Sequence, residues 1–128
     1  MNIFKTRGFD AVVSSGITIA GDLVISPDTT VLIEGEVVGA IRERTTAEGF
    51  GNKTKLEVSG FITVERLEVA NLTVSGTVRC EDLVVPGVLV LKKGAILEAT
   101  NSIHYNELVI ETGAHLTGKL VVLKHDNN

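Results

Sequence analysis

Few side chains of this 128-residue sequence are suited to catalytic or metal chemistry. The three histidines, His104, His115 and His125, are the most obvious metal ligands, but they are 11 and 10 residues apart and His125 belongs to a polar tail. A metal site needs ligands that converge on one point, and this spacing follows no repeat of the sequence. We therefore predict no metal site and no cofactor.

Cysteine and carboxylate chemistry is just as weakly indicated. Cys80 is the only cysteine, which excludes an internal disulfide, and it matches Val64 in an internal repeat, as expected for a small buried side chain. Glu65 and Glu81 are also equivalent in that repeat, but any repeated surface residue stacks in this way, and carbohydrate-cleaving β-helices are much longer. We predict that the protein is not an enzyme.

The internal repeat defines the elements that carry these side chains. Residues 56–69 (LEVSGFITVERLEV) and 72–85 (LTVSGTVRCEDLVV) agree at nearly every apolar position with a shift of about 16 residues. Apolar and polar residues alternate within each copy, which is typical of half-buried strands. We interpret each copy as one coil of a β-solenoid with its aliphatic side chains stacked in columns inside. The repeated Gly60 and Gly76 predict a corner, where glycine adopts backbone angles that β-branched residues avoid.

The composition favours a narrow core and excludes some partners. Hydrophobic residues make up 44% of the chain but aromatic residues only 4%, which suits a thin coil filled with Val, Leu and Ile. The net charge of -4 argues against nucleic acid as a partner, since nucleic acid is bound by basic surfaces. The most apolar stretch, around residues 83–91, is far shorter than the roughly 20 residues that span a bilayer.

Similar coils are predicted on both sides of the central repeat. Alternating aliphatic residues begin at Gly16 and continue to Ile41, and residues 89–97 align with 108–116 at a shift of about 19, which we attribute to a longer turn at residues 100–106. These patterns predict an all-β, single-domain parallel β-helix of about six coils over residues 16–123. Residues 42–53 are polar and form a predicted surface loop, either a tolerated insertion or a partner-binding loop that carries Phe50.

The segments outside the repeat are short. Residues 1–15 form a predicted leader and residues 124–128 a polar tail. In the leader, Ile3 and Phe4 lie beside Lys5 and Arg7, a combination of apolar and cationic side chains that suits an anionic membrane surface. Alternatively, the apolar residues of the leader fold over the first coil as a cap.

A solenoid has two exposed ends, because each terminal coil lacks a neighbour on one side. Neither end of this sequence carries the amphipathic helix that covers the ends of monomeric solenoids. We therefore predict that ends stack on ends. The predicted contact consists of Leu116, Leu120, Val122 and Leu123 at the C-terminal coil and of Ile17, Ile19, Leu23 and Ile25 at the N-terminal coil.

The motifs GEVVGAI at residues 35–41, VSG at 58–60 and 74–76, and above all LVIETGAHLTG at 108–118 resemble those of the bactofilins, the polymer-forming cytoskeletal proteins of bacteria. The resemblance covers about residues 16–123. It implies a right-handed β-helix of triangular section that polymerises end to end, without a cofactor, into filaments that have no structural polarity. It also implies a cytoplasmic, often membrane-associated role in cell shape or in localising other proteins.

Two hypotheses about function follow. The first is a self-assembling scaffold that forms nucleotide-independent homopolymers in the cytoplasm or at the inner face of the cell membrane, where it recruits protein clients. The second is a monomeric or small-oligomer solenoid that presents residues 42–53 to a protein partner. They differ in whether the purified protein is polymeric or discrete.

Overall fold

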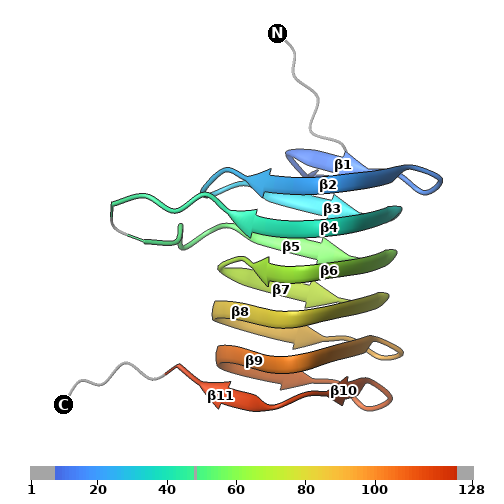
Figure 1. The fold of residues 1–128 in the computed structure, drawn as a ribbon, viewed down its shortest axis with the longest axis vertical. Coiled ribbons are helices and arrows are strands. Elements are labelled where there is room, and N and C mark those ends of the chain that lie inside the picture. The colour runs from blue at the N-terminus through green and yellow to red at the C-terminus, as the bar shows by residue number, and fades with distance from the viewer. Residues whose placement is uncertain (1–7, 48, 124–128) are drawn as a thin grey trace, which may run out of the picture.

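The computed structural model, which describes residues 8–47 and 49–123, is a rod built from one continuous parallel sheet (Figure 1). Every pair of neighbouring strands runs parallel, and the described residues contain no α-helix. The strands are β1 (Ala11–Val13), β2 (Thr18–Ile25), β3 (Thr30–Ile33), β4 (Glu36–Glu43), β5 (Lys55–Val58), β6 (Phe61–Glu68), β7 (Asn71–Val74), β8 (Thr77–Leu91), β9 (Ile96–Ile110), β10 (His115–Thr117) and β11 (Leu120–Val122).

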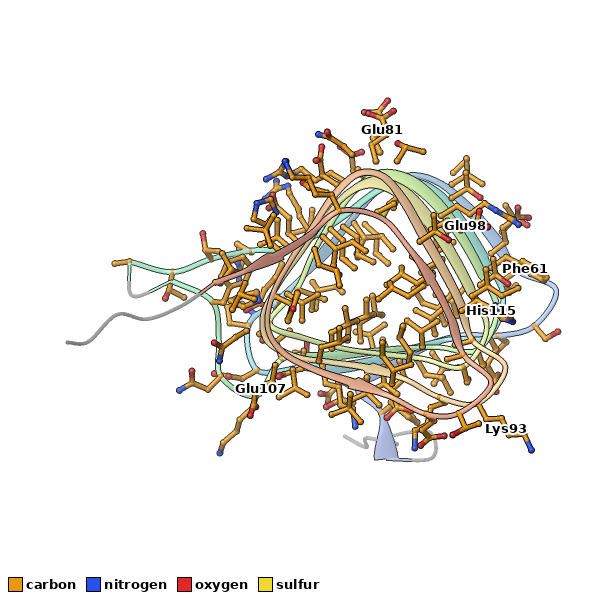
Figure 2. All side chains as sticks on the ribbon, turned by 90° about the horizontal axis from the view of Figure 1, so that it is seen from below. Phe61, Glu81, Lys93, Glu98, Glu107 and His115 are labelled. Atoms are coloured by element: carbon orange, nitrogen blue, oxygen red, sulfur yellow. The ribbon has the colours of Figure 1, made fainter. Side chains whose placement is uncertain are left out.

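Each coil lies in register on the next, so that equivalent residues stack. Leu56 of β5 pairs with Leu72 of β7, which pairs in turn with Leu89 of β8 and then Leu108 of β9. Viewed along its axis, the rod has a triangular outline with side chains filling the interior (Figure 2). The structure confirms the predicted all-β parallel β-helix of about six coils.

The alternation in the sequence separates core from surface as expected. Strand geometry points successive side chains to opposite faces, so every second residue enters the rod. None of the predicted inward side chains of the central repeat is more than 5% exposed: Leu56, Val58, Ile62, Val64, Leu67, Val69, Leu72, Val74, Val78, Cys80, Leu83 and Val85. Full burial of one aliphatic side chain stabilises the folded state by about 1.5–3 kcal/mol.

The Ser-Gly corners are confirmed, but for a different physical reason. Gly60 and Gly76 do not have positive φ angles. Instead, a Cβ atom at Gly60 would lie 2.0 Å from the carbonyl oxygen of Gly35 in the preceding coil, and one at Gly76 would lie 2.3 Å from that of Gly60. Glycine is required because the backbones of successive coils approach closely at this corner, and not because of its conformational freedom.

The longer shift of the last coils has another origin than predicted. Residues 100–106 belong to the uninterrupted strand β9, so the expected turn there is wrong. Two of the three extra residues lie at the Ser-Gly corner, where residues 92–95 connect β8 to β9 in place of the two residues 75–76 that connect β7 to β8. The third lies at residues 100–101, where the register between β8 and β9 shifts within the strand. A longer corner projects outwards and leaves the stacked columns undisturbed.

The boundaries of the sheet also differ from the predicted ones. The first strand, β1, lies within the segment assigned to the leader and pairs with β3, so the sheet begins at Ala11 rather than at Gly16. Arg42 and Glu43 belong to β4, and the chain leaves the sheet only for residues 44–54. The leader and the loop are therefore both shorter than the sequence pattern suggested.

Replacing Gly60 with Ala tests the close approach of the coils. The added methyl group would overlap the Gly35 carbonyl, and forced overpacking of this kind costs about 1–3 kcal/mol. Thermal unfolding followed by circular dichroism should show a lower Tm for Gly60→Ala, whereas Ser59→Ala at the exposed neighbouring position should unfold like the wild type. An unchanged Tm for Gly60→Ala would contradict the packing of this corner.

Candidate functional site at the ends of the rod

The structure does not bring the histidines together. His115 is exposed on β10, while His104 is half-buried on another side of the rod, and His125 lies outside the described residues. Within residues 8–47 and 49–123, no group of three or more His, Cys, Asp or Glu side chains is placed to hold a metal ion.

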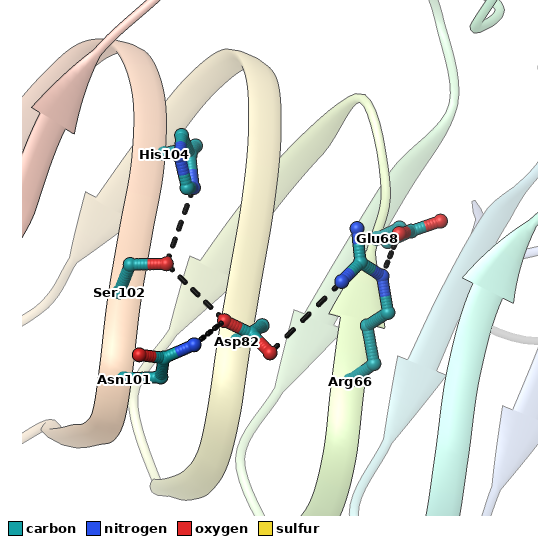
Figure 3. A network of polar contacts seen from close by, with 6 residues as sticks. All are labelled: Arg66, Glu68, Asp82, Asn101, Ser102 and His104. Atoms are coloured by element: carbon teal, nitrogen blue, oxygen red, sulfur yellow. Dashed lines mark hydrogen bonds and ion pairs between the residues drawn. The ribbon is translucent and has the colours of Figure 1, made fainter.

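His104 instead ends a surface chain of polar contacts (Figure 3). Its Nδ1 lies 3.4 Å from the Ser102 hydroxyl, which donates to Asp82 over 3.2 Å. Asp82 also accepts a hydrogen bond from Asn101 and lies 3.9 Å from Arg66. The serine stands between the acid and the imidazole, whereas nucleophilic catalysis needs the imidazole in the middle. This network is therefore suited to joining neighbouring coils at the surface.

The other potentially reactive side chains, Cys80, Glu65 and Glu81, lie where the repeat predicted. Cys80 is 5% exposed, and burial, with a smaller contribution from the Asp82 carboxylate, raises the pKa of its thiol to about 12. The thiol therefore stays protonated at neutral pH and has little nucleophilic character. Glu65 and Glu81 are both exposed, and Figure 2 shows Glu81 at a corner of the triangle.

Residues 113–119 have the spacing Gly-x-x-x-x-Gly-Lys of phosphate-binding loops. Leu120 follows where such loops carry Ser or Thr, and the segment runs from a corner into β10 and towards β11. A phosphate-binding loop connects a strand to a helix, whose N-terminus faces the anion. This segment contains strand β10 and leads into strand β11, so it has no such geometry.

The C-terminal coil exposes side chains that the other coils bury. Leu120 stacks on Ile103, yet Leu120 is 45% exposed and Ile103 is fully buried. Ile110 stacks on Leu91 in the same way, and their exposed fractions are 46% and 0%. Val122 is 51% exposed, while Leu116 and Leu123 are half-buried. The described residues, which end at Leu123, thus leave the interior of the rod open at this end.

The N-terminal coil is more closed. Ile17 is 51% exposed, but Ile19 and Leu23 are half-buried and Ile25 is only 3% exposed. A largely apolar cavity of about 270 Å³ opens between the first strands and is lined by Asp10, Ala11, Val13, Leu23, Val24, Ile25, Ser26, Thr29 and Val31. Leu23 and Ile25 therefore face a hollow rather than a flat surface.

Both terminal coils also have an unpaired backbone edge. Among the described strands, β1 pairs only with β3 and β2 only with β4, while β10 and β11 pair only with β9. An unpaired strand edge offers N–H and C=O groups to another strand. Each end of the rod thus combines an apolar surface with a strand edge.

One end residue was missed by the sequence prediction. Ile110 exposes as much of its side chain as Leu120, but it was not included in the predicted contact. The signal was present, because the alignment of residues 89–97 with 108–116 places Ile110 in the column of the buried Leu91.

The loop at residues 44–54 is fixed to the rod by the buried carboxylate of Glu43. This side chain is 2% exposed and points inwards, in a column that otherwise holds aliphatic residues such as Ile25. Its oxygens accept hydrogen bonds from the backbone N–H of Gly51 (2.6 Å), the hydroxyl of Thr54 (3.0 Å) and the backbone N–H of Ala70 (2.8 Å). The carboxylate therefore joins both ends of the loop to a neighbouring coil.

Phe50, the candidate contact residue of the loop, lies between two cavities. One, of about 590 Å³, also contacts Pro27 and Asp28, and the other, of about 250 Å³, also contacts Asn71 and Pro86. Phe50 is half-buried, so it packs partly along the rod and is not fully presented to solvent.

The fold and its two open ends define this chain as a parallel β-solenoid whose terminal coils are uncovered by the described residues. Comparison with protein-family models matches residues 11–121 to bactofilin, described as polymer-forming cytoskeletal. The chain belongs to the bactofilin family, which confirms the resemblance of its motifs. No curated protein and no solved structure gives a significant match.

Membership of this family supports a structural rather than a catalytic role for the protein. The part of the chain that the structure describes has no helix long and apolar enough to cross a membrane.

Replacing Glu43 with Ala tests the attachment of the loop. Gly51 and Ala70 would lose their acceptor, and hydrogen bonds to charged groups contribute about 1.5–3 kcal/mol each. Limited trypsin digestion should then cleave at Arg44 and Lys53 much faster than in the wild type. The exposed Glu36→Ala is the matched control and should leave the cleavage rate unchanged. Equal digestion of Glu43→Ala and wild type would show that the carboxylate does not hold the loop.

Proposed function

We propose that this protein is the subunit of a cytoskeletal filament that assembles by end-to-end stacking of the rods, without a nucleotide. The observation that carries this proposal is the contrast between equivalent residues of one column. Ile103 is fully buried under the last coil, whereas Leu120 of that coil is 45% exposed. A second rod placed against this end would bury the aliphatic side chains that the described residues leave open.

Two physical terms favour stacking of the ends. Burial of an exposed aliphatic side chain contributes up to about 1.5–3 kcal/mol, and at least three such side chains, Ile110, Leu120 and Val122, are available on the C-terminal coil. Strand edges at both ends supply hydrogen bonds that continue the ladder between molecules. Neither the burial of these side chains nor the hydrogen bonds between strand edges needs a bound cofactor.

The cellular role that fits such a filament is a scaffold for cell shape or for the localisation of other proteins. This role rests on membership of a polymer-forming cytoskeletal family. Cytoplasmic location, peripheral contact with the inner face of the cell membrane and binding of protein clients belong to the same proposal.

A second function, presentation of the loop to a protein partner, is favoured by the Glu43 attachment. A loop that was only a tolerated insertion would not need a buried carboxylate with three hydrogen-bond donors. The two functions are compatible in a filament, and a discrete purified protein would leave the loop as the leading candidate.

Substitution of the C-terminal coil tests the stacking. In Leu120→Arg and Leu116→Arg, a charge without a partner would enter a buried contact, at a cost of several kcal/mol. Each end contact should weaken by roughly a thousand-fold or more, so that negative-stain microscopy and sedimentation detect no filaments.

Thr117→Arg is the matched control, because Thr117 is exposed in the same coil. This variant should form filaments as the wild type does. Filaments of normal length from both leucine variants, with circular dichroism showing folded protein, would exclude the C-terminal coil as the contact.

Deletion of residues 1–7 tests the membrane proposal separately. Ile3, Phe4, Lys5 and Arg7 lie outside the described residues, and their apolar and cationic side chains suit an anionic lipid surface. The deletion should leave filaments intact and abolish co-sedimentation with vesicles that contain anionic lipid. Loss of filaments would instead assign the segment to the end contact.

A further inference from the structure

One aliphatic column of the rod begins with a small side chain. Ala11 of β1 stacks on Val31, and the column continues through Leu56, Leu72 and Leu89. Val31 and the three leucines are buried, whereas Ala11 is exposed. Alanine fills less space than valine or leucine, so the first coil lacks apolar volume at a position that the following coils fill.

A cavity lies beside this position. It is the largely apolar cavity of about 270 Å³ described above, to which Ala11, Val13 and Leu23 contribute, and we name it the N-terminal cavity. It opens between β1, the end of β2 and the start of β3, in the first coil of the rod (Figure 1). Apolar cavities of roughly 150 Å³ bind benzene in other proteins, so the N-terminal cavity has room for an aromatic ring.

Residues 1–7, which lie outside the described residues, have the chemistry of an occupant. Of the segments that the structure does not describe, only this one contains large apolar side chains, among them Ile3 and Phe4. Its charged side chains are the cations Lys5 and Arg7. Asp10 is the only charged one among the described residues that line the cavity, so the charges of segment and cavity are opposite.

The chain enters the rod at the mouth of this cavity. Asp10 lines the cavity and is fixed to β3, because its backbone N–H donates to the carbonyl oxygen of Thr30 and its carboxylate accepts from the N–H of Thr30, each over 2.8 Å. Gly8 has a φ angle of 82°, which lets the chain reverse direction just before β1. Phe4 is six residues before Asp10, or about 20 Å of extended chain, and is therefore within reach of the cavity.

We infer that Phe4 docks in the N-terminal cavity of its own chain and that this position competes with membrane contact. The inference rests on the proposed membrane contact of residues 1–7, since the same apolar side chains serve both positions. A side chain that is buried in the cavity cannot enter a lipid surface, so the two positions exclude each other. Docking therefore lowers the apparent membrane affinity in proportion to the docked fraction.

The chain's own segment is the occupant that the connection favours. Residues 1–7 are joined to the mouth of the cavity, so their local concentration there far exceeds that of a segment from another copy. An unattached apolar molecule has neither this connection nor the cations that face Asp10.

Filling the cavity is the first test. Ala11→Leu gives the first coil the residue type of the coils below and takes up the space for Phe4. In flotation with vesicles of phosphatidylcholine and phosphatidylglycerol, this variant should bind about ten-fold more tightly than the wild type, because the segment is released. Ala20→Leu is the matched control, since Ala20 is an exposed alanine on the outer face of the same coil, and it should bind like the wild type.

The outcomes of the flotation test separate the docking from the membrane contact. Equal binding by Ala11→Leu and the wild type would overturn the inference, and so would an equal gain in Ala20→Leu. Flotation of neither the wild type nor Ala11→Leu would contradict the proposed membrane contact itself.

Cross-linking tests the docking without lipid. Cysteines replace Asn2 and Ser26, an exposed residue that lines the cavity, and a short bis-maleimide is added. Intact mass spectrometry should show bridged monomers, with one reagent molecule joining the two cysteines. Asn2→Cys combined with Ser15→Cys, at an exposed serine of the turn between β1 and β2, is the matched control and should bridge several-fold more slowly.

Two further variants separate docking from simple proximity along the chain. Phe4→Ser and Ala11→Leu, each added to the Asn2→Cys and Ser26→Cys protein, should reduce bridging to the level of the Ser15→Cys control. Undiminished bridging in both would overturn the docking of Phe4. Covalent dimers in place of bridged monomers would assign the cavity to the segment of a second copy and overturn docking within one chain.

Discussion

The structure depends on the in-register stacking of parallel coils. Each internal coil receives backbone hydrogen bonds and aliphatic contacts from the coils on both sides of it, and the two terminal coils receive them from one side. A single coil cannot offset its own loss of conformational entropy, so its stability comes from its neighbours. The exposed Leu120 and Val122 are a direct consequence, because among the described residues their columns end there.

The features that distinguish this rod lie at positions where the regular stacking of the coils is modified. Glycine occurs where the backbones of successive coils touch, as at Gly60, because any side chain would meet the carbonyl above. Glu43 interrupts an aliphatic column and uses its buried carboxylate to hold an eleven-residue excursion, residues 44–54, against the rod. Phe61 is the opposite case, because this bulky aromatic side chain points outwards and is exposed.

Most of the fold could be predicted from the sequence, because the repeat and its two-residue alternation are direct signatures of stacked strands. The pairing of Leu56 with Leu72 and of Leu89 with Leu108 was readable in this way. Strand β1 could not be recognised, since three residues are too few to show alternation. The role of Glu43 depends on backbone donors that are 8 and 27 residues further along the chain, at Gly51 and Ala70, so no local pattern reveals it. At the ends of the rod, the aliphatic columns predicted which residues belong to the terminal coils, but they did not predict how much of each side chain is exposed.

The axial repeat of the assembled protein tests the central claim most directly, and helical reconstruction by electron cryomicroscopy measures it. If stacking continues between molecules, about six coils at a strand spacing of ~4.8 Å give a rise on the order of 30 Å per subunit, with strand density unbroken across the junctions. A discrete particle, or a filament in which the sides of the rods meet while their ends stay exposed to solvent, would contradict end-to-end stacking.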